Sequence, residues 1–309
     1  MSSSHFNKKK VLLFYNPNSG NGLFKNSLDL VISKFQAKKI LVVPVRAGKM
    51  DLLEPVFRNM DQREYIQVIA AGGDGTINLC VNAMIKNGID LPISVFPSGT
   101  ANDFAYYFDL PSDTNSMIDV ALGNNYTYAD VGVMNNRCFI NVAAIGTLVD
   151  VSQRTDPAVK NTLGIISYYL KGITEVPNLK PAVVRLASSE YTGEESIYFM
   201  LVMNGRSAGG FKRISPAASI NDGLLDVMVF REMPIIDFAP LLISIMQGNH
   251  TENKNVLFFK TARLKLESDT DISTDVDGET GEKLPLIFDV LPKRLKVLTK
   301  YNDMQGAIW

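Results

Sequence analysis

A glycine-rich loop between an apolar run and an amphipathic helix constrains this chain more than any other feature. The loop Gly72-Gly73-Asp74-Gly75-Thr76 follows the apolar residues 65–70, which are typical of a buried strand. After it, Ile77, Val81 and Met84 recur at helical spacing. Glycines at such a junction let an anion approach the N–H groups of a helix N-terminus, which predicts a phosphate site. The alternative is a plain β–α turn capped by its own Asp or Thr side chain.

The same alternation fills the first hundred residues. Apolar runs and helical patterns follow one another at 11–15, 23–35, 40–45, 49–60, 65–71, 76–86 and 93–96. Strands that are apolar throughout and alternate with helices indicate a parallel sheet covered on both faces. Polar, glycine-bearing loops follow three of these strands, at 16–22, 72–76 and 98–103. Ligands bind at the carboxyl ends of parallel strands, so we expect these loops to converge.

The pattern changes near residue 129. Runs 126–134 and 137–145 flank Asn135-Asn136, a hairpin signal. More β-like runs follow at 182–188, 196–204, 224–231, 256–267, 270–275 and 286–290, with helical patterns at 161–174 and 234–246. Many strands separated by turn signals predict an antiparallel β-sandwich. We therefore predict an α/β domain over 1–128, possibly completed by 293–309, and a mainly antiparallel β-sandwich domain over 129–292.

Charge and residue counts exclude several kinds of protein. The 31 basic and 32 acidic residues nearly cancel, so no global field would recruit nucleic acid. With only two histidines, a His-rich zinc site or a Ser-His-Asp triad is not expected. The two cysteines, Cys80 and Cys138, lack a CxxC partner and are expected in the core of a cytoplasmic protein. No apolar run is long enough to cross a bilayer, and residues 11–15 are too short for a signal sequence.

The loops match the pattern of a known family. Asn16-Pro17-Asn18-Ser19-Gly20, the Gly72 loop with Asn78, and Ser98-Gly99-Thr100-Ala101-Asn102-Asp103-Phe104 resemble the diacylglycerol kinase catalytic family, which includes sphingosine kinases and bacterial soluble lipid kinases. The resemblance continues through Asn135-Asn136-Arg137, Asn221-Asp222-Gly223 and Asp277-Gly278-Glu279 and covers nearly the whole chain. It is strongest to the bacterial diacylglycerol kinase. The Gly72 loop alone is shared with NAD kinases and phosphofructokinases; the other two loops separate the families.

The resemblance implies an ATP- and Mg²⁺-dependent lipid kinase with its active site in the cleft between an α/β domain and a β-sandwich. The γ-phosphate would pass to a lipid hydroxyl, most simply turning diacylglycerol into phosphatidic acid in phospholipid biosynthesis. Residues implied to bind ATP are Asn16, Pro17, Asn18, Ser19, Gly20, Gly72, Gly73, Asp74, Gly75, Thr76, Asn78, Gly99 and Thr100. Asp74 and Asp103 would help hold the catalytic Mg²⁺, and Glu279 matches the family's general base. The Asp222 side chain, with backbone oxygens at Ser219 and Leu224, matches the ligands of a structural Mg²⁺.

Some positions depart from the family pattern. Many relatives have a basic residue where this chain has Asn21, arginine in place of Tyr106, and threonine near Arg46. Arg46 could contact ATP or could be a surface charge. Two other functions therefore stay open: a nucleotide-binding regulatory protein that has lost transfer, and a kinase for another lipid or for a soluble acceptor such as NAD.

The partner expected from the resemblance is a lipid substrate at the inner face of a membrane, met by peripheral contact. The predicted helix over 161–174 is apolar and aromatic. Lys160, Lys171 and Lys180 flank this apolar stretch, and Lys212-Arg213 follows Gly209-Gly210-Phe211. The helix could dock on anionic headgroups, or it could cover one face of the sandwich. Exposed strand edges also allow a homodimer.

Overall fold

The computed structural model describes residues 9–20, 24–47, 53–146, 149, 180–209, 212 and 214–301. They form two compact units. The first runs to Ala129 and takes in the chain again from Arg294, and the second extends from Asp130 to Lys293. Because the last strand crosses from the second unit into the first, the chain end belongs to the first unit. The predicted helix over 161–174 lies outside the described residues.

The first unit is a parallel sheet with helices on both faces. Its elements are β1 (Lys10–Tyr15), α1 (Phe24–Ala37), β2 (Leu41–Arg46), α2 (Leu53–Arg58), β3 (Tyr65–Gly72), α3 (Asp74–Lys86), β4 (Ile93–Pro97), α4 (Asp103–Tyr107) and α5 (Thr114–Leu122). The strands lie in the order β4-β3-β1-β2, all parallel. The end of β15 (Leu286–Leu298) joins this sheet through Val297, which pairs in parallel with Ile93. The predicted parallel sheet is confirmed.

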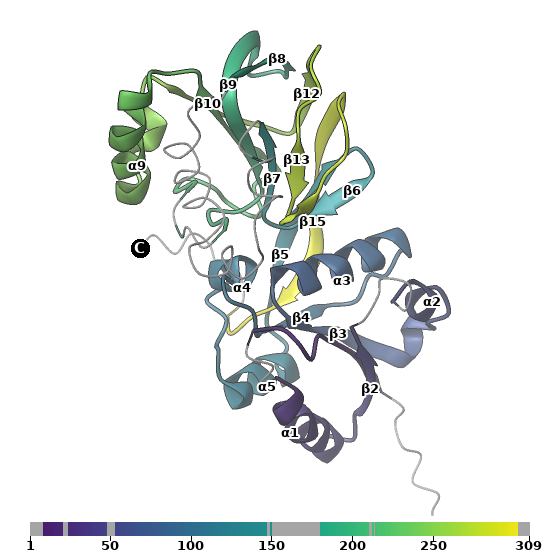
Figure 1. The fold of residues 1–309 in the computed structure, drawn as a ribbon. Coiled ribbons are helices and arrows are strands. Elements are labelled where there is room, and N and C mark those ends of the chain that lie inside the picture. The colour runs from purple at the N-terminus through teal and green to yellow at the C-terminus, as the bar shows by residue number, and fades with distance from the viewer. Residues whose placement is uncertain are drawn as a thin grey trace, which may run out of the picture. The chain divides into compact units, whose positions relative to one another are not determined.

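The apolar character of these strands follows from burial on both faces. Figure 1 shows α1 and α5 on one side of the sheet and α2 and α3 on the other. Val11 and Leu13 face the α1–α5 side, where they pack with Phe35 and Ile118. Their neighbour Leu12 is also fully buried. A strand with water on neither side has few positions for a polar residue, which explains the absence of alternation. Gln67 and Ser94 are buried in this sheet, and the Ser94 hydroxyl donates to Gln67 Oε1 at 2.6 Å.

Two helices of this unit were not predicted. α5 begins after Asp113, whose carboxylate accepts the backbone N–H of Ser116 at 2.9 Å. This is an ordinary N-cap, and the apolar spacing of Met117, Ile118 and Ala121 follows it, so the sequence did carry the signal. α4 is only five residues long, too short for periodicity to reveal it.

The second unit is built of antiparallel strands. Its elements are β5 (Tyr126–Met134), β6 (Arg137–Phe139), β7 (Val142–Gly146), β8 (Ala182–Ala187), β9 (Thr192–Met203), β10 (Leu225–Arg231), α9 (Phe238–Gln247), β11 (Val256–Thr261), β12 (Arg263–Glu267), β13 (Thr274–Val276), β14 (Glu279–Thr280) and most of β15. The order is β14-β13-β7-β9-β8-β12-β15, and β10 pairs with β9 and β11. β5 and β6 form the hairpin predicted at Asn135-Asn136.

The core of this unit lies on both sides of its central strands. Along β9, Met200 and Val202 pack into one apolar cluster, and Phe199 and Leu201 pack into another. α9 contributes Leu241 and Ile245 to the second cluster, and Figure 1 shows it on the outside of β10. The helix therefore supplies the cover that makes continuous burial of β9 possible.

Two runs predicted as single strands are each broken. The break between β6 and β7 occurs where the Asp277 carboxylate accepts the backbone N–H groups of Ile140, Asn141 and Val142 at 2.8, 3.1 and 2.9 Å. A side chain there replaces the partner strand. The break after β11 follows Thr261, whose hydroxyl donates to the Arg263 carbonyl at 2.9 Å.

Among the described residues, no helix is long and apolar enough to cross a membrane. Cys80 and Cys138 are both buried, as expected. Burial raises the pKa of the Cys80 thiol to about 12, which keeps it protonated and inert.

Candidate functional site

The three glycine-bearing loops meet at the carboxyl ends of β1, β3 and β4. The backbone N–H of Asn16 donates to the carbonyl of Ala71 at 2.9 Å, which ties the first loop to the end of β3. The N–H of Ser98 donates to the carbonyl of Gly72 at 2.9 Å, which ties the third loop to the second. Neighbouring parallel strands thus bring together segments that are 55 and 26 residues apart in sequence.

The glycines let these loops touch backbone to backbone. A Cβ on Gly99 would lie 2.5 Å from the Cα of Gly73, and one on Gly20 would lie 2.2 Å from the carbonyl oxygen of Ser98. Gly20 also has a φ of +55°, which disfavours other residues. With no side chains between them, the loops can present backbone N–H groups to a phosphate.

Asp74 connects the second loop to the third. Its carboxylate accepts the backbone N–H of Asp103 at 3.1 Å and that of Phe104 at 3.0 Å. These are N–H groups of the first turn of α4, which has no side-chain cap of its own. Asp103 is itself only 4% exposed. Asp74 and Asp103 are therefore neighbours beside the glycine loops, and carboxylate oxygens are ligands that Mg²⁺ prefers.

The remaining residues of the predicted nucleotide site hold the loops in shape. The Asn16 amide donates to the Thr76 hydroxyl at 3.4 Å, and its Oδ1 accepts the N–H of Asn18 at 2.9 Å. Thr76 and Asn78 are buried in the first turns of α3. Arg46 ends β2 beside Tyr15 and is exposed. Pro17, Ser19 and Thr100 lie within the same loops, and Gly75 lies in the first turn of α3. Asn21 lies outside the described residues.

A cavity of about 460 Å³ adjoins the loops on the side of α1 and α5. It is lined by Gly20, Phe24, Ser27, Pro97, Ser98, Gly99, Thr100, Asn102, Ser112, Thr114 and Met117. The Ser98 hydroxyl is buried and has no hydrogen-bond partner among the described residues. An unused buried donor beside a cavity suits a ligand that brings an acceptor.

Glu279 stands in the second unit, in β14. The Arg137 guanidinium, from β6, donates to its Oε2 at 3.0 Å and to the carbonyl of Thr280 at 2.8 Å. The Glu279 side chain is 57% exposed, so it stays hydrated and can meet an incoming group. The Arg137 guanidinium holds the Glu279 carboxylate in one orientation, and a general base must be positioned in this way.

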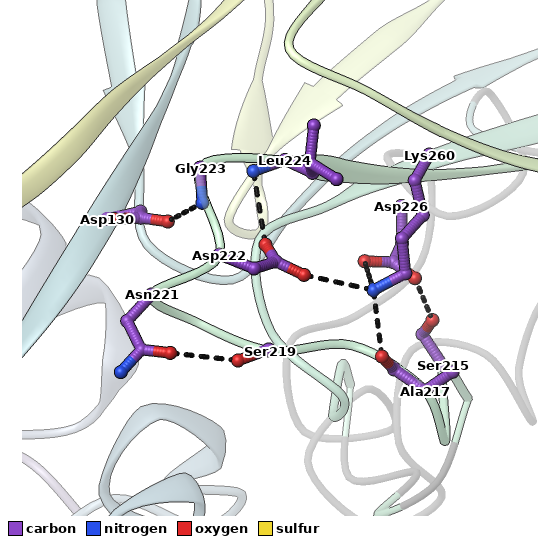
Figure 2. A network of polar contacts seen from close by, with 10 residues as sticks. All are labelled: Asp130, Ser215, Ala217, Ser219, Asn221, Asp222, Gly223, Leu224, Asp226 and Lys260. Atoms are coloured by element: carbon purple, nitrogen blue, oxygen red, sulfur yellow. Dashed lines mark hydrogen bonds and ion pairs between the residues drawn. The ribbon is translucent and has the colours of Figure 1, made fainter. Parts of the chain in front are cut away.

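The predicted ligands of a structural Mg²⁺ lie in a turn before β10. Asp222 uses one oxygen to accept the N–H of Leu224 at 3.1 Å and the other to accept from Lys260 Nζ at 3.1 Å (Figure 2). The Ser219 hydroxyl donates to Asn221 Oδ1 at 2.9 Å. Among the described residues, no cluster of three or more acidic, His or Cys side chains could hold a metal ion. Lys260 is the cation that the Asp222 carboxylate contacts in this structure.

Sequence reasoning missed three residues that act on these sites. Asn102, in the left-handed conformation, accepts the N–H of Gly99 at 2.9 Å and donates to its carbonyl at 2.8 Å. Arg137 pairs with Glu279, and Lys260 pairs with Asp222. Only Asn102 had a local signal, because Asn is enriched in left-handed turns. The Arg137–Glu279 and Lys260–Asp222 pairs had no local signal, because each joins segments that are distant in sequence.

Comparison with known proteins identifies close relatives. Residues 10–134 match the model of the diacylglycerol kinase catalytic domain, and residues 141–299 match that of the YegS C-terminal NAD kinase beta sandwich-like domain. A Staphylococcus saprophyticus protein named diacylglycerol kinase is 33% identical over 97% of this chain and 98% of its own. One from Staphylococcus aureus, with the same name, is 32% identical over 96% and 94%.

Solved structures agree. A crystal structure from Bacillus anthracis, described as a candidate diacylglycerol kinase, superimposes with a TM-score of 0.82 at 25% identity. The match covers 97% of this chain and 98% of that one.

Proposed function

The chain belongs to the diacylglycerol kinase catalytic domain family, and on that premise we propose that it is an ATP-dependent lipid kinase. It transfers the γ-phosphate to a lipid hydroxyl, with diacylglycerol as the expected acceptor and phosphatidic acid as the product. One observation carries the proposal: three glycine-bearing loops meet at one sheet edge, next to Asp74 and Asp103. Phosphoryl transfer needs such positioning and charge neutralisation.

In this proposal the loops bind the phosphates through backbone N–H groups, and Thr100 contacts the nucleotide. Asp74 and Asp103 would hold Mg²⁺, which neutralises phosphate charge when bound. The lipid hydroxyl oxygen attacks the γ-phosphorus, the bond to the bridging oxygen breaks, and ADP leaves. Glu279 accepts the hydroxyl proton, and Arg137 keeps its carboxylate oriented.

Because the acceptor lies in a membrane and ATP lies in the cytoplasm, we propose that the protein works at the cytoplasmic surface of a membrane. A homodimer stays a prediction.

The test is transfer of labelled γ-phosphate from ATP and Mg²⁺ into micellar lipids, with NAD as a soluble acceptor. Glu279→Gln removes the proposed base while keeping the shape of the side chain, and Glu282→Gln, three residues away in the same loop region, is the matched control. We expect labelled lipid from the wild type and the control, and a loss of about 100-fold or more in Glu279→Gln. Label in NAD alone would replace the lipid acceptor with a soluble one, and ATP binding without any transfer would favour a regulatory protein.

A further inference from the structure

A lysine contacts Asp222, the side chain that family resemblance gives to a structural metal ion. The ammonium of Lys260, in β11, donates to the carbonyl of Ala217 at 2.8 Å and to Asp222 Oδ2 at 3.1 Å (Figure 2). It also lies 3.6 Å from Asp226 Oδ2. An ammonium carries three N–H donors, and three oxygens from three different residues surround this one.

Strand pairing places this lysine. β10 and β11 are antiparallel, and their register sets Asp226 opposite Lys260. Residues directly opposite each other project to the same face of a sheet. Asp226 is fully buried and accepts a hydrogen bond from the Ser215 hydroxyl at 2.9 Å. A buried carboxylate requires a balancing charge, and the cross-strand lysine provides it.

The same ammonium fixes the segment that leads into β10. Ala217 and Asp222 both belong to this segment, so Lys260 ties it to β11 at two points. On the other side, Asp130 accepts the N–H of Gly223 at 2.7 Å and donates its own N–H to the carbonyl of Ile220 at 2.7 Å. The turn is thus held from both sides by protein groups.

A divalent ion does not fit this arrangement. Asp222 Oδ2 already accepts a hydrogen bond from the Lys260 ammonium. Because Mg²⁺ binds oxygen at about 2.1 Å, an ion on the same oxygen would lie within about 5 Å of that ammonium. Like charges at that separation repel. An ion on the other Asp222 oxygen, Oδ1, would share that oxygen with the N–H of Leu224.

We propose that Lys260 is the built-in cation of the Asp222 turn, so that this turn is ordered without Mg²⁺. The proposal is independent of the reaction, because it concerns only how the second unit keeps its shape. It predicts that divalent ions leave this turn unchanged in nucleotide-free protein.

Hydrogen–deuterium exchange of the peptide over residues 214–226, read by mass spectrometry, tests it. In the wild type we expect equal exchange with excess Mg²⁺ and with EDTA. Lys260→Met should raise exchange in this peptide and lower the unfolding midpoint by roughly 5 to 10 °C. Lys254→Met, an exposed position just before β11, is the matched control and should change neither.

Two results would overturn the proposal. One is slower exchange of the wild-type peptide in Mg²⁺ that disappears in Asp222→Asn, because the turn would then hold a divalent ion. The other is a Lys260→Met protein in which the exchange of this peptide and the unfolding midpoint both equal those of the wild type. The comparison of the wild type with Asp222→Asn tests the proposal even where Lys260→Met fails to fold. Neither exchange nor the unfolding midpoint depends on catalytic activity.

Discussion

The carboxylate of Asp74, in the first turn of α3, accepts the backbone N–H of Asp103 at 3.1 Å. The neighbouring N–H of Phe104 donates to the same carboxylate at 3.0 Å. A residue that the family resemblance assigns to metal and nucleotide binding is therefore also the N-terminal cap of α4. Any variant of Asp74 therefore changes both the proposed metal and nucleotide ligand and the cap that positions Asp103.

Asp74→Ala should lose both activity and stability. Two charge-assisted bonds to α4 disappear, and we expect the free energy of unfolding to fall by about 1 to 2 kcal/mol. Denaturant midpoints measure this, with Asp29→Ala, on the exposed side of α1, as the control. Asp74→Asn keeps one acceptor oxygen and should retain more stability than Asp74→Ala while still losing transfer. Equal stability of Asp74→Ala and wild type would show that the cap contributes nothing.

Arg137 should act on the reaction through Glu279. Arg137→Ala leaves the carboxylate without its guanidinium partner, and we expect kcat to fall by roughly tenfold with little change in the KM for ATP. Arg137→Lys keeps the charge and should recover part of the rate. Arg185→Ala removes a different exposed ion pair, with Asp269, and serves as the control.

The loop site can be predicted from the sequence because each of its loops directly follows an apolar strand. Continuous apolar strands imply a parallel sheet, and loops after such strands must end at one edge. Gly73 and Gly99 follow neighbouring strands and are therefore expected to lie next to each other, as they do in the structure.

The pairs that were missed depend on strand register. Lys260 reaches Asp222 only because β11 pairs with β10 so that residue 260 opposes residue 226. Arg137 reaches Glu279 only because two short strands, β6 and β14, bring them together. Composition and periodicity carry no information about register between distant strands. The same limit explains the break at Ile140, which a carboxylate 137 residues away creates.

Stability should fall in mild acid because of His250. This side chain is fully buried, and its Nε2 donates to the carbonyl of Ile214 at 2.7 Å. Burial lowers the pKa of His250 below its usual 6.5. In the unfolded chain the imidazole takes up a proton near pH 6.5, whereas the folded protein resists it, so the stabilisation is present above that pH and is lost as the pH falls below it. Unfolding midpoints of wild type and His250→Gln across this range should converge as the pH drops; a constant difference would contradict the assignment.

Two glycines of the same site should respond in opposite ways to alanine. At Gly99 a Cβ would lie 2.5 Å from the backbone of Gly73, so Gly99→Ala must push the second and third loops apart. We expect loss of ATP binding, measured by calorimetry, and a lower unfolding midpoint. At Gly75 a Cβ meets nothing within 4 Å, and the residue lies in the first turn of α3. Gly75→Ala should therefore keep or raise the midpoint, by up to about 1 kcal/mol in the free energy of unfolding, since alanine favours helix. A Gly99→Ala protein as stable as Gly75→Ala would mean that the loops do not need to touch.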